Sequence, residues 1–85
     1  MTINGNWRVG SDGSVTCWHG SIMTLVTRGE RYFLWYVADF DRKATVANGG
    51  VRIDRYGSSN ESESAAMAAA DEARIKYEEL KANGR

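Results

Sequence analysis

Two pairs of side chains in this sequence are spaced closely enough to do chemistry together. Cys17 and His19 are two residues apart, so on a strand they share one face, and a thiol beside an imidazole can act as a nucleophile. Asp39 and Asp41 have the same spacing and are suited to binding a metal or to acid–base catalysis. Neither pair has converging partners nearby in the sequence. We interpret the first as a strand-end histidine beside a small buried thiol, and the second as part of a charged turn.

Metal and cofactor motifs are missing from the sequence. His19 is the only histidine and Cys17 the only cysteine, too few for a zinc site built from these residue types. The nine glycines are scattered over turns and form no phosphate-binding pattern. We therefore expect a protein that is not an enzyme and uses no cofactor.

The size and charge of the chain narrow its class further. Its 85 residues predict one small domain over residues 1–85. Eleven basic and eleven acidic residues cancel, so no strong overall field attracts nucleic acid or anionic lipid. No apolar run reaches the ~20 residues of a membrane span, and no signal sequence opens the chain. With a single cysteine, these features predict a cytoplasmic protein without a membrane partner.

The central element is the run from Arg31 to Ala38, which is rich in aromatic and β-favouring residues. A strand here places Phe33 and Trp35 on one face and Tyr32 and Tyr36 on the other. A strand that is apolar on both faces needs cover on each side. The sequence offers one clear helix, so it leaves open what covers the second face.

Short strands are expected on both sides of this run, all within residues 7–56. Asp12-Gly13 and Asn48-Gly49-Gly50 are strong hairpin signals, because their residues accept positive φ. The predicted strands are Trp7–Val9, Val15–His19, Ile22–Thr27, Arg31–Ala38, Ala44–Ala47 and Val51–Tyr56. The third and fourth, which are long and joined by a tight turn, are expected to form the antiparallel centre of the sheet, with the last strand at an edge.

A helix is predicted over residues 61–82. Ser58 with Glu61, and Asn60 with Glu63, have capping-box spacing, and Asn83-Gly84 is a natural end. One stripe of this helix is expected to face the sheet: Ser62, Ala66, Ala69, Ala70, Ala73, Tyr77 and Leu80. Ile75 is expected on the outer side, with Met67 and Ala68 near it. The fold class is therefore α+β, an antiparallel sheet of four to six short strands with one C-terminal helix packed on one face.

The aromatic strand allows two interpretations. Either both faces are covered and the aromatic residues are core, or one face stays open as a binding platform. On the second interpretation the anchors are Trp35 and Phe33, or Tyr32 and Tyr36, because aromatic residues dominate interface energetics. We expect self-association as a homodimer through the face that the helix leaves uncovered. The alternative is that residues 1–20, with Trp7 and Trp18, fold over this face and close a small barrel.

The second half of the chain resembles AP2-type and integrase arm-binding DNA domains. The resemblance spans residues 30–80 and rests on the runs 32–37 and 49–53, followed by the Ser- and Glu-containing link into an Ala-rich helix. In those families a three-stranded sheet precedes a helix packed across it. The resemblance implies that the sheet docks in a DNA major groove. By position, the candidate contacts are Arg28, Arg31, Arg52 and Arg55.

The chain as a whole also resembles the small orphan proteins of bacteriophages and mobile elements, including inhibitors of host defence such as anti-CRISPR proteins. These are commonly short, non-catalytic and free of cofactors. The leading hypothesis is therefore a non-enzymatic protein-binding module that occupies the surface of a protein partner. The alternative is a nucleic-acid-binding domain that uses its sheet.

Overall fold

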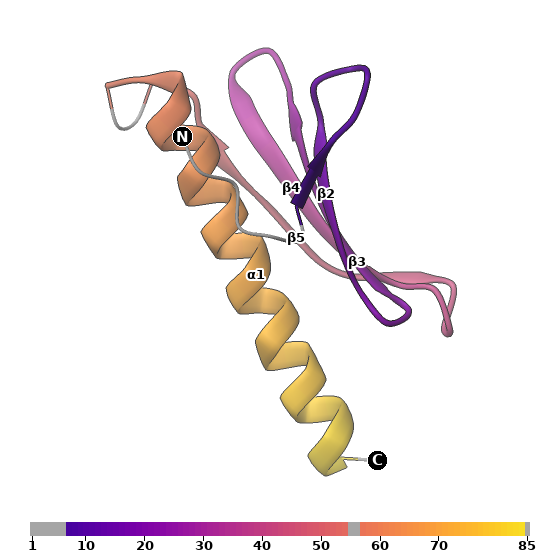
Figure 1. Ribbon diagram of the computed structural model, residues 1–85. Coiled ribbons are helices and arrows are strands. Elements are labelled where there is room, and N and C mark those ends of the chain that lie inside the picture. Colours follow the sequence, from indigo (N-terminus) through magenta and orange to yellow (C-terminus); the bar gives the residue numbers. More distant parts are fainter. Residues whose placement is uncertain (1–6, 55–56, 85) are drawn as a thin grey trace.

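The structure, a computed structural model, describes residues 7–54 and 57–84. These residues form a five-stranded antiparallel sheet and one helix, which confirms the predicted α+β fold (Figure 1). The elements are β1 (Trp7–Val9), β2 (Val15–His19), β3 (Ile22–Arg28), β4 (Tyr32–Asp39), β5 (Ala44–Arg52) and α1 (Ser59–Gly84). The strand order is β1-β2-β3-β4-β5, so each strand pairs with its neighbours in sequence. The long strands β3 and β4 lie at the centre, as expected.

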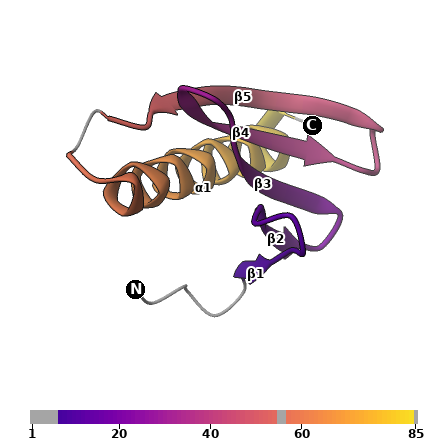
Figure 2. The ribbon, with the colours of Figure 1, turned by 90° about the horizontal axis from the view of Figure 1, so that it is seen from above.

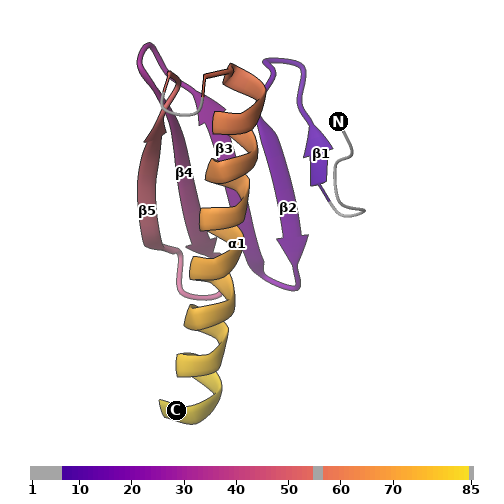
Figure 3. The same cartoon turned by 90° about the vertical axis from the view of Figure 1, so that its left-hand side faces the viewer.

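The molecule has two layers, and α1 lies against one face of the sheet. Figure 3 shows α1 in front of the sheet, and Figure 2 shows the same arrangement from above. The helix packs on β3, β4 and β5. No described element lies on the opposite face. β1 and β2 extend the sheet sideways, so the barrel in which they would fold over this face is not formed by residues 7–20.

The core lies between the sheet and α1. Every second strand residue points toward the helix, where three small or flexible helix residues, Ala66, Met67 and Ala70, meet them. Alanine lets the helix axis approach the sheet, and bulky strand side chains fill the space that remains. The buried strand members of this cluster are Val15, Val26 and Phe33, and Trp7, Trp35, Val51 and Ile53 pack around it.

The start of α1 follows the predicted capping signal. The Glu61 backbone N–H donates to the Ser58 hydroxyl oxygen at 3.2 Å, which satisfies one free donor of the first turn. One turn further on, the buried Ser62 hydroxyl donates to the Ile53 carbonyl at 2.7 Å. This bond ties the helix to the chain that leaves β5.

The helix faces the sheet with a stripe that differs from the predicted one. Ser62, Ala66 and Ala70 are buried as expected, but Met67, expected near the outer side, is also buried. Leu80, expected on the inner stripe, is 71% exposed. The reason is visible in Figure 3, where the C-terminal turns of α1 extend past the end of the sheet. A residue there has no strand to pack on.

The predicted hairpin at Asn48-Gly49-Gly50 is wrong, because β5 runs through these residues as one strand. Gly49 pairs with Trp35 of β4. A Cβ at position 49 would lie 2.5 Å from the Trp35 ring atom Cζ2, so glycine here makes room for the indole. The predicted strand Val51–Tyr56 is also wrong in extent. β5 ends at Arg52, and residues 55–56 lie outside the described residues.

Candidate functional site

The face of the sheet opposite α1 carries several large apolar side chains that no described element covers. We call it the open face. It is formed by Trp18 of β2, Met23 and Leu25 of β3, and Tyr32, Leu34 and Tyr36 of β4. The strand register places these residues side by side, because Trp18 pairs with Met23, and Leu25 with Tyr36. Apolar side chains therefore form a continuous band across three strands.

Several open-face side chains are strongly exposed for their size. Trp18 is 47% exposed, Tyr32 45% and Leu34 36%. Phe40, in the turn after β4, is 52% exposed and extends the band, since its ring centroid lies 5.1 Å from that of Trp18. The two exposed rings therefore form one aromatic patch.

The structure separates the four predicted aromatic anchors into two pairs. Tyr32 and Tyr36 lie on the open face, so of the two predicted pairs of anchors this is the one that the helix leaves uncovered. Phe33 and Trp35 point toward α1. Phe33 is only 3% exposed and belongs to the core, and Trp35 packs against that core. These two side chains are therefore structural, because they fill the space between the sheet and the alanine-rich part of the helix.

The predicted arginines that the structure describes lie at one end of the sheet but not all on the same face. The Arg28 guanidinium lies 5.5 Å from the centre of the Phe33 ring, on the helix side of the sheet. Arg52 pairs with Asp54 at 3.2 Å. Arg31 lies at the same end of the sheet, since its carbonyl accepts a hydrogen bond from the Ile53 N–H. Arg55 lies outside the described residues.

A shallow depression at this end of the sheet brings Arg31 and Arg52 together. Glu30 and Asp54 line it as well, so its two basic side chains face two acidic ones. Arg52 donates to both carboxylate oxygens of Asp54, and this contact raises the pKa of Arg52. The depression is therefore balanced in charge and has no excess of positive charge for a phosphate.

Sequence reasoning did not name Trp18, Phe40 or Leu34 as contact residues. A signal for Trp18 was present, because in Val15–His19 the residues Val15 and Cys17 share one face and Trp18 falls on the other. Phe40 carried no such signal. It lies in a turn, and its position beside Trp18 depends on the turn at Ser21, whose carbonyl accepts a hydrogen bond from the Phe40 N–H.

The acidic pair Asp39 and Asp41 serves a structural network. The fully buried Asp39 carboxylate accepts hydrogen bonds from the Tyr77 hydroxyl at 2.6 Å and the Lys81 ammonium at 3.0 Å. It also accepts one from the Asp41 backbone N–H at 3.0 Å. The Tyr77 hydrogen bond, followed by the contacts with Lys81 and the Asp41 N–H, lowers the pKa of Asp39 to about 2. The network fastens the C-terminal half of α1 to the end of β4.

The Cys17–His19 pair is not arranged as a reactive nucleophile. The Cys17 sulfur lies 3.6 Å from Nδ1 of His19, but the cysteine is only 2% exposed. Burial raises the pKa of the Cys17 thiol, which keeps it protonated at neutral pH. The interpretation as a buried thiol beside a strand-end histidine agrees with this geometry.

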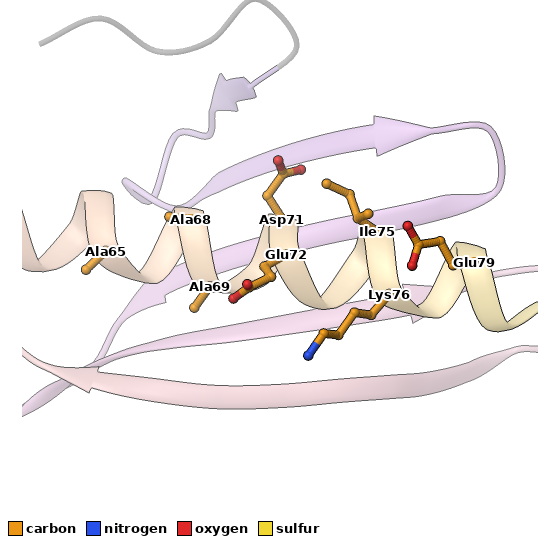
Figure 4. Close-up of a pocket in the computed structure, with 8 residues that line it drawn as sticks. All are labelled: Ala65, Ala68, Ala69, Asp71, Glu72, Ile75, Lys76 and Glu79. Carbon is orange, nitrogen blue, oxygen red and sulfur yellow. The ribbon is translucent and has the colours of Figure 1, made fainter.

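The other side of the molecule, the outer side of α1, carries a second depression. Figure 4 shows the residues that line it, among them Ile75 between Asp71 and Glu79. All of the lining residues come from α1 itself, so the depression is a surface between helix side chains and has no second wall. Within residues 7–54 and 57–84, no group of three His, Cys, Asp or Glu side chains is arranged to hold a metal ion.

Comparisons with known proteins add no relative. No protein-family model, no curated protein and no solved structure matches the chain. In the part of the chain that the structure describes, no helix combines the length and apolar character needed to cross a membrane.

Proposed function

We propose that this chain is a non-catalytic protein-binding domain that docks on a partner protein through the open face. The observation that carries the proposal is the exposed band of Trp18, Tyr32, Leu34 and Phe40 on a sheet face that no described element covers. Large exposed apolar patches are uncommon on monomeric proteins and mark interaction sites. Tryptophan and tyrosine are also the residue types most enriched among interface hot spots.

The four most exposed side chains supply about half of the area that a protein interface buries on each partner. With ~200 Å² for each large side chain, the exposed fractions of these four residues amount to roughly 400 Å². A stable interface buries about 800 Å² on each partner. The half-buried open-face residues Met23, Leu25 and Tyr36, with the threonines beside them, contribute to the remainder.

Two features favour binding over catalysis. The buried Cys17 thiol is held protonated, and the Asp39 carboxylate is occupied by Tyr77 and Lys81. The open face itself offers rings, aliphatic chains and hydroxyl groups. Such a surface acts by occupying an apolar site on another protein, which is the occlusion mechanism expected of small inhibitors from bacteriophages or mobile elements. A reduced, buried thiol also suits a cytoplasmic setting.

The proposal is tested with a double variant, Trp18→Ser with Leu34→Ser, and a matched control, Ile75→Ser. Ile75 is 43% exposed on the outer side of α1, so its substitution removes an apolar group comparable with Leu34 from the other side of the molecule. Proteins captured by the wild type are identified, purified and titrated by calorimetry. The open-face variant should lose binding by more than tenfold, while the control binds as the wild type does. Equal binding of all three proteins would reject the open face as the interface.

A second candidate, nucleic-acid binding by the sheet, is favoured by the charges on the open face. In the strand register, Arg8 of β1 lies opposite Thr16, which is on the same face as Trp18. Arg52 of β5 lies opposite Tyr32, so both arginines are on the open face. No acidic residue occupies an open-face position on the described strands. Aromatic rings flanked by arginines can stack on bases and contact phosphates.

Gel-shift titration separates the two candidates. The probes are a random duplex and a random single strand, each at low and at moderate salt. Binding that weakens steeply with salt and is lost in Arg8→Ala with Arg52→Ala supports the second candidate. Absence of a shift at low salt would reject the second candidate.

A further inference from the structure

The outer edge of β5 carries backbone groups that have no partner among the described residues. β5 is the last strand of the sheet, so only one of its edges is paired. The Ile53 N–H donates to the Arg31 carbonyl at 2.9 Å, so the backbone groups of Ile53 point inward, toward the neighbouring strand. In an antiparallel pair, residues whose backbone groups point inward alternate with residues whose groups point outward, away from the neighbouring strand. By this alternation Asn48, Gly50 and Arg52 point their N–H and C=O groups outward. None of these groups forms a hydrogen bond with residues 7–54 or 57–84.

The two edges of the sheet differ in how they are protected. β1 is three residues long and carries the charged Arg8, two features that discourage pairing with another strand. β5 is nine residues long, and its residues from Ala44 to Val51 include no charge and no proline. A bulge at Val46 interrupts only its first part, which leaves Ala47–Arg52 regular. An edge of this length, with its single charge at the last residue, is a template for a further strand.

We infer that the β5 edge binds the same edge of a second copy of this chain, in antiparallel register, to form a continuous ten-stranded sheet. A two-fold axis at Gly50 places Asn48 opposite Arg52 of the second copy, so the pairing stays within the regular part of β5. The outward groups of Asn48, Gly50 and Arg52 in both copies are satisfied at once. Two-fold closure makes the assembly a dimer.

This pairing also determines where the two open faces lie. A two-fold axis that relates edge-paired strands stands perpendicular to the sheet, so both helices are on one side and both open faces on the other. The two bands of exposed apolar side chains then share one surface of the dimer. The inference rests on the β5 backbone alone and stands whether or not the open face binds a partner.

Sedimentation equilibrium of three proteins tests the inference. The wild type should show a species of twice the 9.4 kDa chain mass at micromolar concentration. Asn48→Pro removes an outward N–H, a change that an edge strand tolerates, and across the two-fold axis it removes two hydrogen bonds. It should weaken the dimer about thirtyfold. Asn48→Ala keeps the N–H and should dimerise as the wild type does. A monomeric wild type, or equal dimerisation of the proline and alanine variants, would overturn the inference.

Disulfide trapping gives a second measurement that does not depend on how well the proline variant folds. Gly50→Cys should form a covalent dimer under mild oxidation, since Gly50 lies on the two-fold axis opposite its own copy, and opposed residues on paired strands lie within disulfide distance. The native Cys17 is buried, so the wild type is the control. Leu34→Cys reports the competing dimer through the open face. Trapping at Leu34 and not at Gly50 would replace the edge dimer with that arrangement.

Discussion

Replacing Gly49 by alanine should destabilise the protein, although the same change one residue later should not. Gly49 lies in the middle of β5 opposite Trp35. A Cβ at Gly49 would lie 2.5 Å from Cζ2, 2.7 Å from Cε2 and 2.9 Å from Nε1 of that indole. A Cβ at Gly50, on the other face, would have its nearest neighbour, Leu34 Cδ2, at 3.4 Å. The two adjacent glycines therefore form a matched pair.

Two opposing effects determine the size of the change. Alanine restricts the unfolded chain, which by itself favours the folded protein by ~0.5–1 kcal/mol at either position. At position 49 the Trp35 ring must also move as a rigid body, although it packs against the core. Forcing an extra methyl group into a packed contact costs ~1–3 kcal/mol. We expect Gly49→Ala to lower the free energy of unfolding by about 1–2 kcal/mol and Gly50→Ala to raise it by up to ~0.5 kcal/mol.

Guanidinium denaturation followed by far-ultraviolet circular dichroism measures both free energies without relying on tryptophan fluorescence. A double-mutant cycle with Trp35→Phe identifies the cause, because the smaller ring does not fill the space above Gly49. In that background the penalty of Gly49→Ala should fall below ~0.5 kcal/mol. The reasoning is refuted if Gly49→Ala is as stable as Gly50→Ala, or if its penalty is unchanged in the Trp35→Phe background.

Three further predictions concern buried polar groups. Because the pKa of Asp39 falls from the ordinary 3.8 to about 2 on folding, its stabilising contribution is complete above pH 4 and is lost as the pH falls toward 2. Asp39→Asn should therefore have a lower free energy of unfolding than the wild type in urea at pH 6. If the difference between the two proteins stayed constant down to pH 2, the Asp39 charge would not be its cause. Ser62→Ala leaves the Ile53 carbonyl without its 2.7 Å hydrogen bond and should lower the free energy of unfolding by ~1–3 kcal/mol in the same assay, whereas no loss would show that the bond is dispensable. The buried Cys17 thiol should react with Ellman's reagent at least tenfold more slowly in the native protein than in urea, and equal rates would contradict its burial.

The sequence by itself determined the elements that depend on neighbouring residues. Alternating and β-branched side chains predicted β1 to β4 to within a residue or two, and the serine and glutamate before the alanine run predicted the start of α1. The assignment of residues to the two faces of β4 was also available, because side chains alternate along a strand whatever surrounds it. These features are local, so a single sequence contains the information that specifies them.

The tertiary structure decided what depends on residues far apart in the chain. Asn48-Gly49-Gly50 has the local chemistry of a turn, yet it continues as a strand, because Gly49 faces an indole 14 residues earlier. Met67 is buried because the rotation of α1 is set by the side chains beneath it. Whether residues 7–20 cover the sheet or extend it was likewise open in the sequence. It was decided by the pairing of β2 with β3, which continues the sheet outward and leaves Trp18 exposed on its open face.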